Sequence, residues 1–254
     1  MLEKLSKNFN KKRVLDSFTL NKIVNKISKF LKEADYVLDL GCGSGRILVP
    51  LAKRLPSVNF LGLDISSSML SAAKKYSVKG GLKNIHFVKQ DMNDDKWVGA
   101  LAEKSFNGII LFQSIHFASN TYRLLDRVSK LLKENGVIII ASTSHKQFFE
   151  LPYSKAFPGV LELELNRTPN TQSLIQFLRT RGFRAVTNEQ IEVKINFKNR
   201  GKIKKWLYSK PFSALTILKG NSFNKGVDKF LSIVNKTVLV DKFFLTVFRN
   251  SSTS

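Results

Sequence analysis

Three glycines at alternate positions, in the run Tyr36–Gly45 (YVLDLGCGSG), constrain this chain more than any other feature. An apolar stretch typical of a β-strand enters the glycine turn, and an amphipathic helical pattern over residues 47–55 leaves it. This order of strand, glycine-rich turn and helix is how an α/β sheet brings its backbone close to a nucleotide-like ligand. Each glycine removes a Cβ that would block the ligand or demand a strained φ. The run therefore predicts an α/β fold with a ligand at this turn.

The spacing of the glycines argues against a dinucleotide. The dinucleotide fingerprint needs Gly at the first, third and sixth positions of the turn. Counted from Gly41, the sixth position is Arg46, and the third glycine comes one residue early at Gly45. Asp39 precedes the turn, where a carboxylate would repel a pyrophosphate but suits an ammonium group. The pattern D-x-G-x-G-x-G resembles motif I of the class I S-adenosylmethionine-dependent methyltransferases, and NAD binding is the weaker alternative.

A second acidic residue follows the next predicted strand, residues 58–63. Asp64 lies about 20 residues past the glycine turn, where doubly wound folds place the acid that binds ribose hydroxyls. A carboxylate that accepts hydroxyl hydrogen bonds makes charge-assisted, strong ones. The alternative is that Asp64 caps the N-terminus of a helix. The phrase GLDISSSMLSAA from Gly62 to Ala73 closely resembles motif II of the small-molecule methyltransferases.

The following segments alternate in the same way. Strands are predicted at residues 85–90, 106–112 and 137–141, with a helix at 124–132 and a turn at Asn135-Gly136. The last two strands are almost continuously apolar, as a parallel strand covered on both faces requires. The chain is therefore expected to form a Rossmann-like, doubly wound α/β sheet. The resemblance to the methyltransferase core covers roughly residues 30–145.

Outside this core, residues 8–31 predict one or two amphipathic helices, and residues 145–170 an irregular stretch rich in Phe and Pro. A helix is predicted from Thr171, a possible N-cap, to Arg181, and strands at residues 190–197 and 243–248. The resemblance implies a seven-stranded, mostly parallel sheet whose last strand is antiparallel and lies between strands five and six. Residues 201–237 hold helical patterns expected to form part of a lid. A looser resemblance links the tail to methyltransferases of the trans-aconitate and ubiquinone-biosynthesis type.

One domain is expected over residues 1–254, with N-terminal helices at 1–34, a cofactor-binding core at 35–145, and a substrate cap with the closing strands at 146–254. The resemblance implies S-adenosyl-L-methionine as the cofactor. It assigns the methionine moiety to the glycine turn, the ribose to Asp64 and the adenine to the acid after the third strand. The residues implied to bind the cofactor are Asp39, Gly41, Cys42, Gly43, Gly45, Asp64, Ile65, Asp91, Met92 and Gln113.

His116 is the candidate catalytic base. It follows the fourth strand, where the loop faces the methyl group in the family, and imidazole titrates near ~6.5. Methyl transfer is an in-line displacement that needs mainly alignment and exclusion of water, so a base is required only for some acceptors. The alternative is that His116 supports the loop or lines the pocket.

Composition limits the remaining possibilities. No segment approaches the ~20 apolar residues of a membrane helix, and the first residues lack the apolar core of a signal peptide. The single cysteine excludes an internal disulfide, and the 3 histidines show no metal-ligand spacing. These observations predict a soluble, cytoplasmic protein with no metal.

The net charge of +23 leaves the partner open. Residues 181–254 hold 15 Lys and Arg against 4 Asp and Glu, a field that attracts nucleic acid, an anionic membrane or an acidic substrate. Compositional drift is the alternative, because Lys far outnumbers Arg. The loop after the fourth strand, Gln113-Ser114-Ile115-His116, lacks the Asn/Asp-Pro-Pro-aromatic motif of base amino methyltransferases. Cys42 lies in the glycine turn and is therefore misplaced for a cytosine C5 nucleophile. A small-molecule acceptor is therefore favoured over RNA and over a binding protein without activity.

Overall fold

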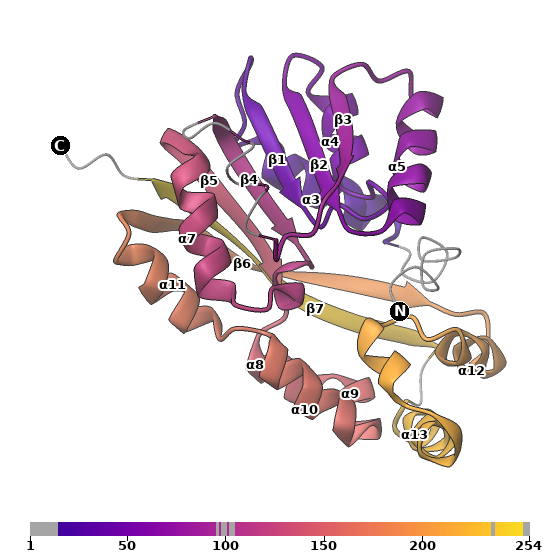
Figure 1. Cartoon of the computed structure of the whole chain (residues 1–254). Helices are drawn as coiled ribbons and strands as arrows, with labels where there is room; N and C mark the ends of the chain where they lie inside the picture. Colours follow the sequence, from indigo (N-terminus) through magenta and orange to yellow (C-terminus); the bar gives the residue numbers. More distant parts are fainter. Residues whose placement is uncertain (1–14, 95–96, 98–100, 102–104, 235–236, 251–254) are drawn as a thin grey trace.

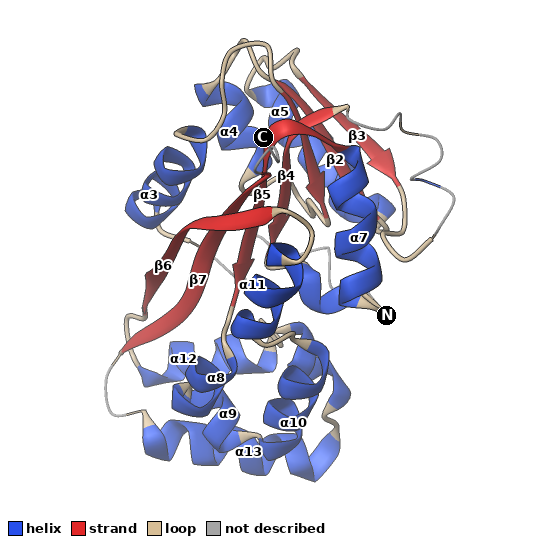
Figure 2. Ribbon diagram, turned by 90° about the vertical axis from the view of Figure 1, so that its left-hand side faces the viewer, coloured by secondary structure: helices blue, strands red, loops and turns tan. Residues whose placement is uncertain are grey.

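A seven-stranded sheet, with helices on both faces and a helical cap beyond one end, forms the protein (Figures 1 and 2). The computed structural model describes residues 15–94, 97, 101, 105–234 and 237–250. The strands are β1 (Tyr36–Leu40), β2 (Asn59–Asp64), β3 (Ile85–Lys89), β4 (Phe106–Phe112), β5 (Leu132–Ser142), β6 (Phe183–Asn196) and β7 (Val238–Asn250). The helices are α3 (Ser17–Ser28), α4 (Leu48–Arg54), α5 (Ser67–Lys79), α7 (Thr121–Leu131), α8 (His145–Glu150), α9 (Pro152–Ala156), α10 (Pro158–Arg167), α11 (Thr171–Arg179), α12 (Arg200–Tyr208) and α13 (Gly220–Ile233), with 3-10 turns η1 (Ile115–Phe117) and η2 (Ser213–Ile217).

The strand order is β3-β2-β1-β4-β5-β7-β6. The first five strands pair in parallel, and β7 runs antiparallel between β5 and β6. This confirms the expected mostly parallel sheet with its last strand inserted before the sixth. The chain proceeds from β1 to β2 and β3 on one side, and then returns to place β4 on the other side of β1. The loops after β1 and β4 therefore diverge, and the crevice between them is where open α/β sheets bind ligands.

Alternate residues of each central strand pack into different cores, which explains the apolar runs in the sequence. On β1, the buried Val37 packs with α3 and α4, whereas its neighbour Leu38 packs with α7 and α11 on the opposite face. A parallel strand buried on both faces needs apolar residues at successive positions. The expected N-terminal helices appear here as α3, whose Asp16 cap accepts a hydrogen bond from the Thr19 N–H at 2.9 Å; residues 1–14 lie outside the described part.

The stretch expected to be irregular, residues 145–170, is helical, so that prediction was wrong. Pro152 begins α9 and Pro158 begins α10. Proline suits the first turn of a helix because its φ is preset and its missing N–H has no partner there in any case. Ser144 and Gln147 form a capping box at the start of α8. The prolines therefore divide one helical segment into three short helices.

Two local details also differ from expectation. The Asn135-Gly136 turn lies inside β5 as a bulge, where the pairing with β4 shifts and Asn135 adopts a φ of 60°. The N-cap of α11 is Asn170 and not Thr171, since the Asn170 side chain accepts the Gln172 N–H at 2.8 Å. The strands β6 and β7 are 14 and 13 residues long, well beyond the predicted segments. Their outer halves extend past β5 toward the cap.

The cap has an apolar core of its own, built from α8, α9, α10, α12, η2 and α13. The helical patterns at residues 201–237 correspond to α12, η2 and α13, as expected. Phe157 stacks on Phe223 of α13 with ring centroids 5.8 Å apart, and Gly226 on the same helix lets α13 lie close to the Phe157 ring. Among the described residues no helix is long and apolar enough to cross a bilayer.

We expect Gly226→Ala to destabilise the cap. A Cβ at position 226 would lie 2.1 Å from ring atoms of the buried Phe157. Overpacking of this kind costs roughly 1–3 kcal/mol, which exceeds the ~0.5–1 kcal/mol gained by replacing a helical glycine. The control is Gly159→Ala on α10, where the nearest atom beyond the chain neighbours and the local helix backbone would lie 4.0 Å from the added Cβ. Thermal unfolding gives the midpoint temperature of each variant, and we expect the lower midpoint for Gly226→Ala. A midpoint for Gly226→Ala at or above that of Gly159→Ala would contradict the packing argument.

Candidate functional site

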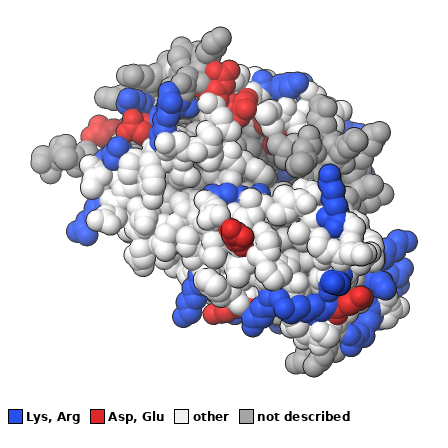
Figure 3. Space-filling view, turned by 60° about the horizontal axis from the view of Figure 1, so that its bottom comes forward, with Lys and Arg blue, Asp and Glu red and all other residues white. Residues whose placement is uncertain are grey.

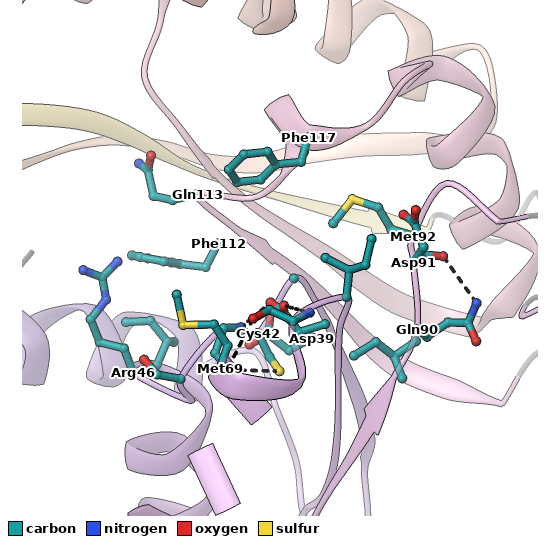
Figure 4. A pocket seen from close by; sticks show the side chains of 18 of the residues that line it. Asp39, Cys42, Arg46, Met69, Gln90, Asp91, Met92, Phe112, Gln113 and Phe117 are labelled. Atoms are coloured by element: carbon teal, nitrogen blue, oxygen red, sulfur yellow. Dashed lines mark hydrogen bonds between the residues drawn. The ribbon is translucent and has the colours of Figure 1, made fainter. Parts of the chain in front are cut away.

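A cleft opens at the carboxyl ends of β1, β2, β3 and β4, where the strand order predicts a ligand (Figure 4). Its floor is the glycine turn after β1, and its walls come from the loops after the other three strands. One residue of the cap, Ser213, reaches its rim. Its lining residues are Asp39, Gly41, Cys42, Gly43, Ser44, Arg46, Ile47, Leu63, Asp64, Ile65, Ser66, Met69, Gln90, Asp91, Met92, Asn93, Phe112, Gln113, Phe117 and Ser213.

All three glycines of the turn have positive φ, with values of 75° at Gly41, 56° at Gly43 and 75° at Gly45. Other residues adopt this conformation only with strain. A Cβ on Gly41 would lie 2.6 Å from Ser114 Cβ, and one on Gly45 would lie 2.7 Å from a methyl of Val49. Beside Gly43 no atom lies within 4 Å of the Cβ position. Gly41 and Gly45 therefore allow close packing inside the protein, and Gly43 leaves open space in the cleft.

Asp64 fixes the glycine turn to the helix that follows β2. Its Oδ2 accepts the Gly43 N–H at 2.8 Å, and its Oδ1 accepts the Ser66 N–H at 2.8 Å. Burial raises the pKa of Asp64, and these two N–H donors partly oppose the shift. Ser66 caps α5, so the alternative interpretation of Asp64 as the N-cap was wrong. Each carboxylate oxygen keeps a lone pair for a further donor.

Asp39 is buried without a hydrogen-bond partner for its Oδ1 among the described residues. Burial, together with the nearby Asp64 carboxylate, raises the pKa of Asp39 to about 8. A buried carboxyl group with no internal cation is costly when ionised, so the site favours a ligand that brings a positive charge. Burial also raises the pKa of the neighbouring Cys42 thiol, which therefore stays protonated and is a poor nucleophile.

Asn93 connects the loop after β3 to the 3-10 turn η1 after β4, two segments that border the cleft. The Asp91 Oδ1 accepts hydrogen bonds from the Asn93 N–H at 2.9 Å and from its Nδ2 at 3.1 Å. Asn93 Nδ2 also donates to the Phe117 carbonyl at 3.2 Å, and its Oδ1 accepts the Ser119 N–H at 2.7 Å. The loop after β3 is thereby attached to η1, and Phe117 lies above the cleft across from Met92 (Figure 4).

The loop after β4 is held in a strained conformation. Gln113 has a φ of 54°, unusual for a residue other than glycine. Its N–H donates to the Ala141 carbonyl at 2.9 Å, and the next side chain, Ser114, donates from Oγ to the Leu40 carbonyl at 2.6 Å. Strain of this kind persists where surrounding contacts enforce it, and it is common at functional sites.

The structure brings together most of the residues that the sequence singled out. The cleft is lined by Asp39, Gly41, Cys42, Gly43, Asp64, Ile65, Asp91, Met92 and Gln113. Gly45 is not among the lining residues and packs instead against α4 and α5. His116 also lies outside the described lining, on η1, with its ring centroid 4.3 Å from that of Phe117.

Sequence reasoning missed several aromatic and cationic groups at the mouth. Arg46 lies over the ring of Phe112, with Cζ 5.9 Å from the ring centroid (Figure 4). Arg167 of the cap lies 5.6 Å from the ring of Phe117 and donates to Ser213 Oγ at 3.0 Å. Arg46 was visible as the residue that ends the glycine pattern, but nothing in the sequence indicated that Arg167 would reach η1.

Comparison with known proteins gives the family. The profile of the family described as "Methyltransferase domain" matches residues 13–193, which is most of the chain. The chain belongs to this methyltransferase family. The match confirms the resemblance to the class I S-adenosylmethionine-dependent methyltransferases, and S-adenosylmethionine is the cofactor of that class. The deep, partly unpaired Asp39 and the open space beside Gly43 fit a cofactor that carries an ammonium group.

Individual relatives are more distant. A tRNA (guanine-N(7)-)-methyltransferase of Christiangramia forsetii is 30% identical over 121 residues, covering 45% of this chain and 54% of that protein. Malonyl-[acyl-carrier protein] O-methyltransferase 2 of Ilyobacter polytropus is 25% identical, covering 65% and 63%. The chain matches only 26% to 54% of the length of four such tRNA methyltransferases. The solved Geobacter sulfurreducens methyltransferase shares the fold, with a TM-score of 0.62 at 14% identity over 98% of this chain and 99% of that one.

The pKa of Asp39 predicts a pH dependence of stability. Folding raises this pKa from 3.8 to about 8. At pH values between these two, Asp39 is therefore protonated in the folded protein and ionised in the unfolded chain. The contribution of Asp39 to stability is therefore complete below about pH 4 and is lost as the pH rises toward 8. We expect Asp39→Asn to flatten the fall of the unfolding midpoint between about pH 5 and 8, measured without cofactor. Because all other titrating groups are common to both proteins, a difference between the two pH profiles reports on Asp39. Parallel profiles would refute a raised pKa of Asp39 in the folded protein.

Proposed function

We propose that this methyltransferase transfers a methyl group from S-adenosylmethionine to a small-molecule acceptor held between the cleft and the cap. The buried Asp39 Oδ1, to which no described residue donates a hydrogen bond, is the observation that carries the proposal, because a cationic group of a ligand would be a suitable partner for it at the foot of the glycine turn. The chain would work as a single domain, with residues 35–145 holding the cofactor and residues 146–254 covering the acceptor.

Each predicted cofactor residue has a proposed role. Asp39 would pair with the ammonium group of the methionine moiety, and the backbone at Gly41, Cys42 and Gly43 would surround that moiety. Asp64 would accept hydrogen bonds from the ribose hydroxyls beside Ile65, since both its oxygens retain acceptor capacity. Asp91 and Met92 would contact the adenine edge, and Gln113 would lie near the reacting end. Gly45 would act through packing alone.

The protein's own contribution to the reaction is alignment and exclusion of water. The cofactor supplies a methyl group that is already activated by its sulfonium charge. Phe112, Phe117 and Met92 line the cleft with apolar surface, and such a surface keeps water from the reacting atoms. The hydrogen bonds of Asn93 and Ser114 fix the loops that carry these side chains. Alignment of two bound reactants in a fixed geometry is a large source of rate enhancement.

An RNA acceptor is the second candidate, supported by the surface of the cap and by the tRNA methyltransferases among the relatives. Lys and Arg gather along the lower right of the face in Figure 3. On and beside α12 and α13, the exposed cations are Lys198, Arg200, Lys202, Lys204, Lys205, Lys219, Lys225 and Lys229, against Asp228 alone among the acids of residues 198–229. Phosphate-driven binding would fall steeply with salt. A protein that binds the cofactor without transferring its methyl group is the third candidate.

One experiment separates the three candidates. The protein is incubated with S-adenosylmethionine labelled in its methyl group, together with either a metabolite extract or total tRNA. We expect label in a small-molecule fraction. Label only in tRNA favours the RNA candidate, and calorimetric cofactor binding without any transfer favours the binding protein. A cytoplasmic location is proposed with this function, in keeping with the single cysteine.

Asp64→Ala tests the cofactor assignment. We expect the affinity for S-adenosylmethionine to fall at least tenfold, about 1.4 kcal/mol, because the hydroxyl pairing is lost. Titration calorimetry measures the dissociation constant, with Asp94→Ala, an exposed acid on the loop after β3, as the control. A dissociation constant of the Asp64 variant within twofold of the wild type would refute the role. Circular dichroism shows whether both variants are folded.

A catalytic role for His116 stays a prediction. If its imidazole takes the acceptor proton, His116→Ala should lower turnover by a factor of roughly 100 or more with cofactor affinity retained. Phe117→Ala is the matched comparison, because Phe117 lines the cleft and His116 does not. If turnover is unchanged in His116→Ala and reduced in Phe117→Ala, the catalytic role of His116 is refuted, and η1 contributes to turnover through the Phe117 ring.

A further inference from the structure

Three cavities continue from the cleft beneath the cap, and each shares wall residues with the next. The cleft and the second cavity share Arg46, Phe112 and Gln113. The second and third cavities share Ile195, Phe212 and Asp241. The third and the outermost cavity share Leu151, Pro152, Leu239 and Val240. The four spaces therefore form a row from the proposed methyl-transfer position to the far side of the cap.

The row follows the outer half of β7, where Asp241 and Phe243 line the second cavity from one face of the strand, and Val238, Val240 and Lys242 line the outermost cavity from the other face. The row therefore passes from one face of the strand to the other. This half of β7 pairs with β6 but not with β5, whose pairing begins at Phe244. On the side that β5 leaves open, residues of α8 and α9 line the two outer cavities. At about 3.3 Å per residue, five residues of strand give the row a length of roughly 17 Å beyond the cleft.

The walls of the row are mainly apolar and aromatic. Asp241 is the acid among the lining residues of the two inner cavities, and its Oδ1 accepts the Lys242 N–H at 2.9 Å. At the outer rim, Lys242 Nζ lies 3.8 Å from a carboxylate oxygen of Glu150. A negatively charged group would be repelled at Asp241. Between Gln113 at the cleft and Lys242 at the outer rim, the other lining side chains are mainly apolar, which suits an uncharged, apolar part of a ligand.

The row is wide at both ends and narrow in the middle. The cleft and the outermost cavity have volumes of about 220 and 420 Å³, whereas the two inner cavities have about 40 and 20 Å³. A ring system needs more room than this, and an unbranched chain, as the narrowest apolar group, is the one that suits the constriction. At the outer end Ile233, Val238 and Val240 are 38%, 38% and 37% exposed, so a longer chain can emerge there.

We propose that the acceptor carries an unbranched apolar chain, of the acyl or alkyl class, which lies in this row while its nucleophilic head reaches the cleft. The inference rests on the proposed function for the identity of the head, but the chain site itself is independent of methyl transfer. Arg46 and Gln113, shared by the cleft and the second cavity, are then the polar residues beside the head.

The test uses butanol, hexanol, octanol and decanol as probes, titrated into the full chain with and without S-adenosylhomocysteine. Burial of each methylene should tighten binding roughly fourfold, up to the length at which the row is filled. Equal affinity for butanol and decanol would overturn the proposal. Failure of S-adenosylhomocysteine to bind would contradict the proposed function instead, and leaves the alkanol series interpretable.

Ile195→Trp blocks the row at the junction of its inner cavities, and Val240→Trp blocks it further out. We expect Ile195→Trp to weaken decanol binding at least tenfold while butanol affinity stays unchanged, and Val240→Trp to weaken only the longest probes. The matched control is Val88→Trp, which adds the same ring to an exposed position on the opposite edge strand, β3. Unchanged decanol binding in a folded Ile195→Trp protein would overturn the proposal; if that variant does not fold, Val240→Trp and the wild-type series decide.

Discussion

Two carboxylates at the ends of neighbouring parallel strands set the conditions for the rest of the site. Parallel pairing puts the ends of β1 and β2 at the same edge, so Asp39 and Asp64 are buried close enough for one to raise the pKa of the other. Asp64 is satisfied by two backbone N–H groups, and it thereby fixes the glycine turn. Asp39 has no hydrogen-bond partner for one oxygen within the described part of the chain. A bound cationic group would therefore stabilise the ionised form of Asp39 at this edge of the sheet.

The sequence predicts the features of this sheet edge that depend on residues close together in the chain, and it does not predict the contacts between distant segments. The glycines at 41, 43 and 45 need positive φ within a single turn, and Asp39 and Asp64 are at fixed offsets from that turn. Spacing therefore singled them out as candidates, and the resemblance of the surrounding motifs to the methyltransferases favoured a cofactor site over the alternatives. The hydrogen bond from Asn93 to the Phe117 carbonyl joins two loops that are far apart in sequence, and no sequence pattern predicts it. The same is true of Arg167, which reaches Phe117 only because the cap folds back.

Outside the core, the secondary structure expected from the sequence was wrong where one residue type serves two purposes. The prolines at 152 and 158 break a helix in its interior but begin one at its first turn, and composition does not distinguish these positions. The antiparallel pair β6–β7 extends well beyond its apolar alternation because backbone pairing continues where polar side chains face solvent. Such lengths are decided by pairing with a partner strand, and a single sequence does not specify that partner.

The division between sheet edge and cap has a consequence for specificity. The cofactor side is fixed by short-range geometry, in which small changes would strain the glycine turn. The cap instead has an apolar core of its own, and Arg167 connects it to Phe117 of η1. Its bidentate pairing with the buried Glu164, at 2.9 and 2.7 Å, holds that guanidinium in place. A cap attached in this way can change its inner walls, and hence its acceptor, while the methyl-donor site stays the same.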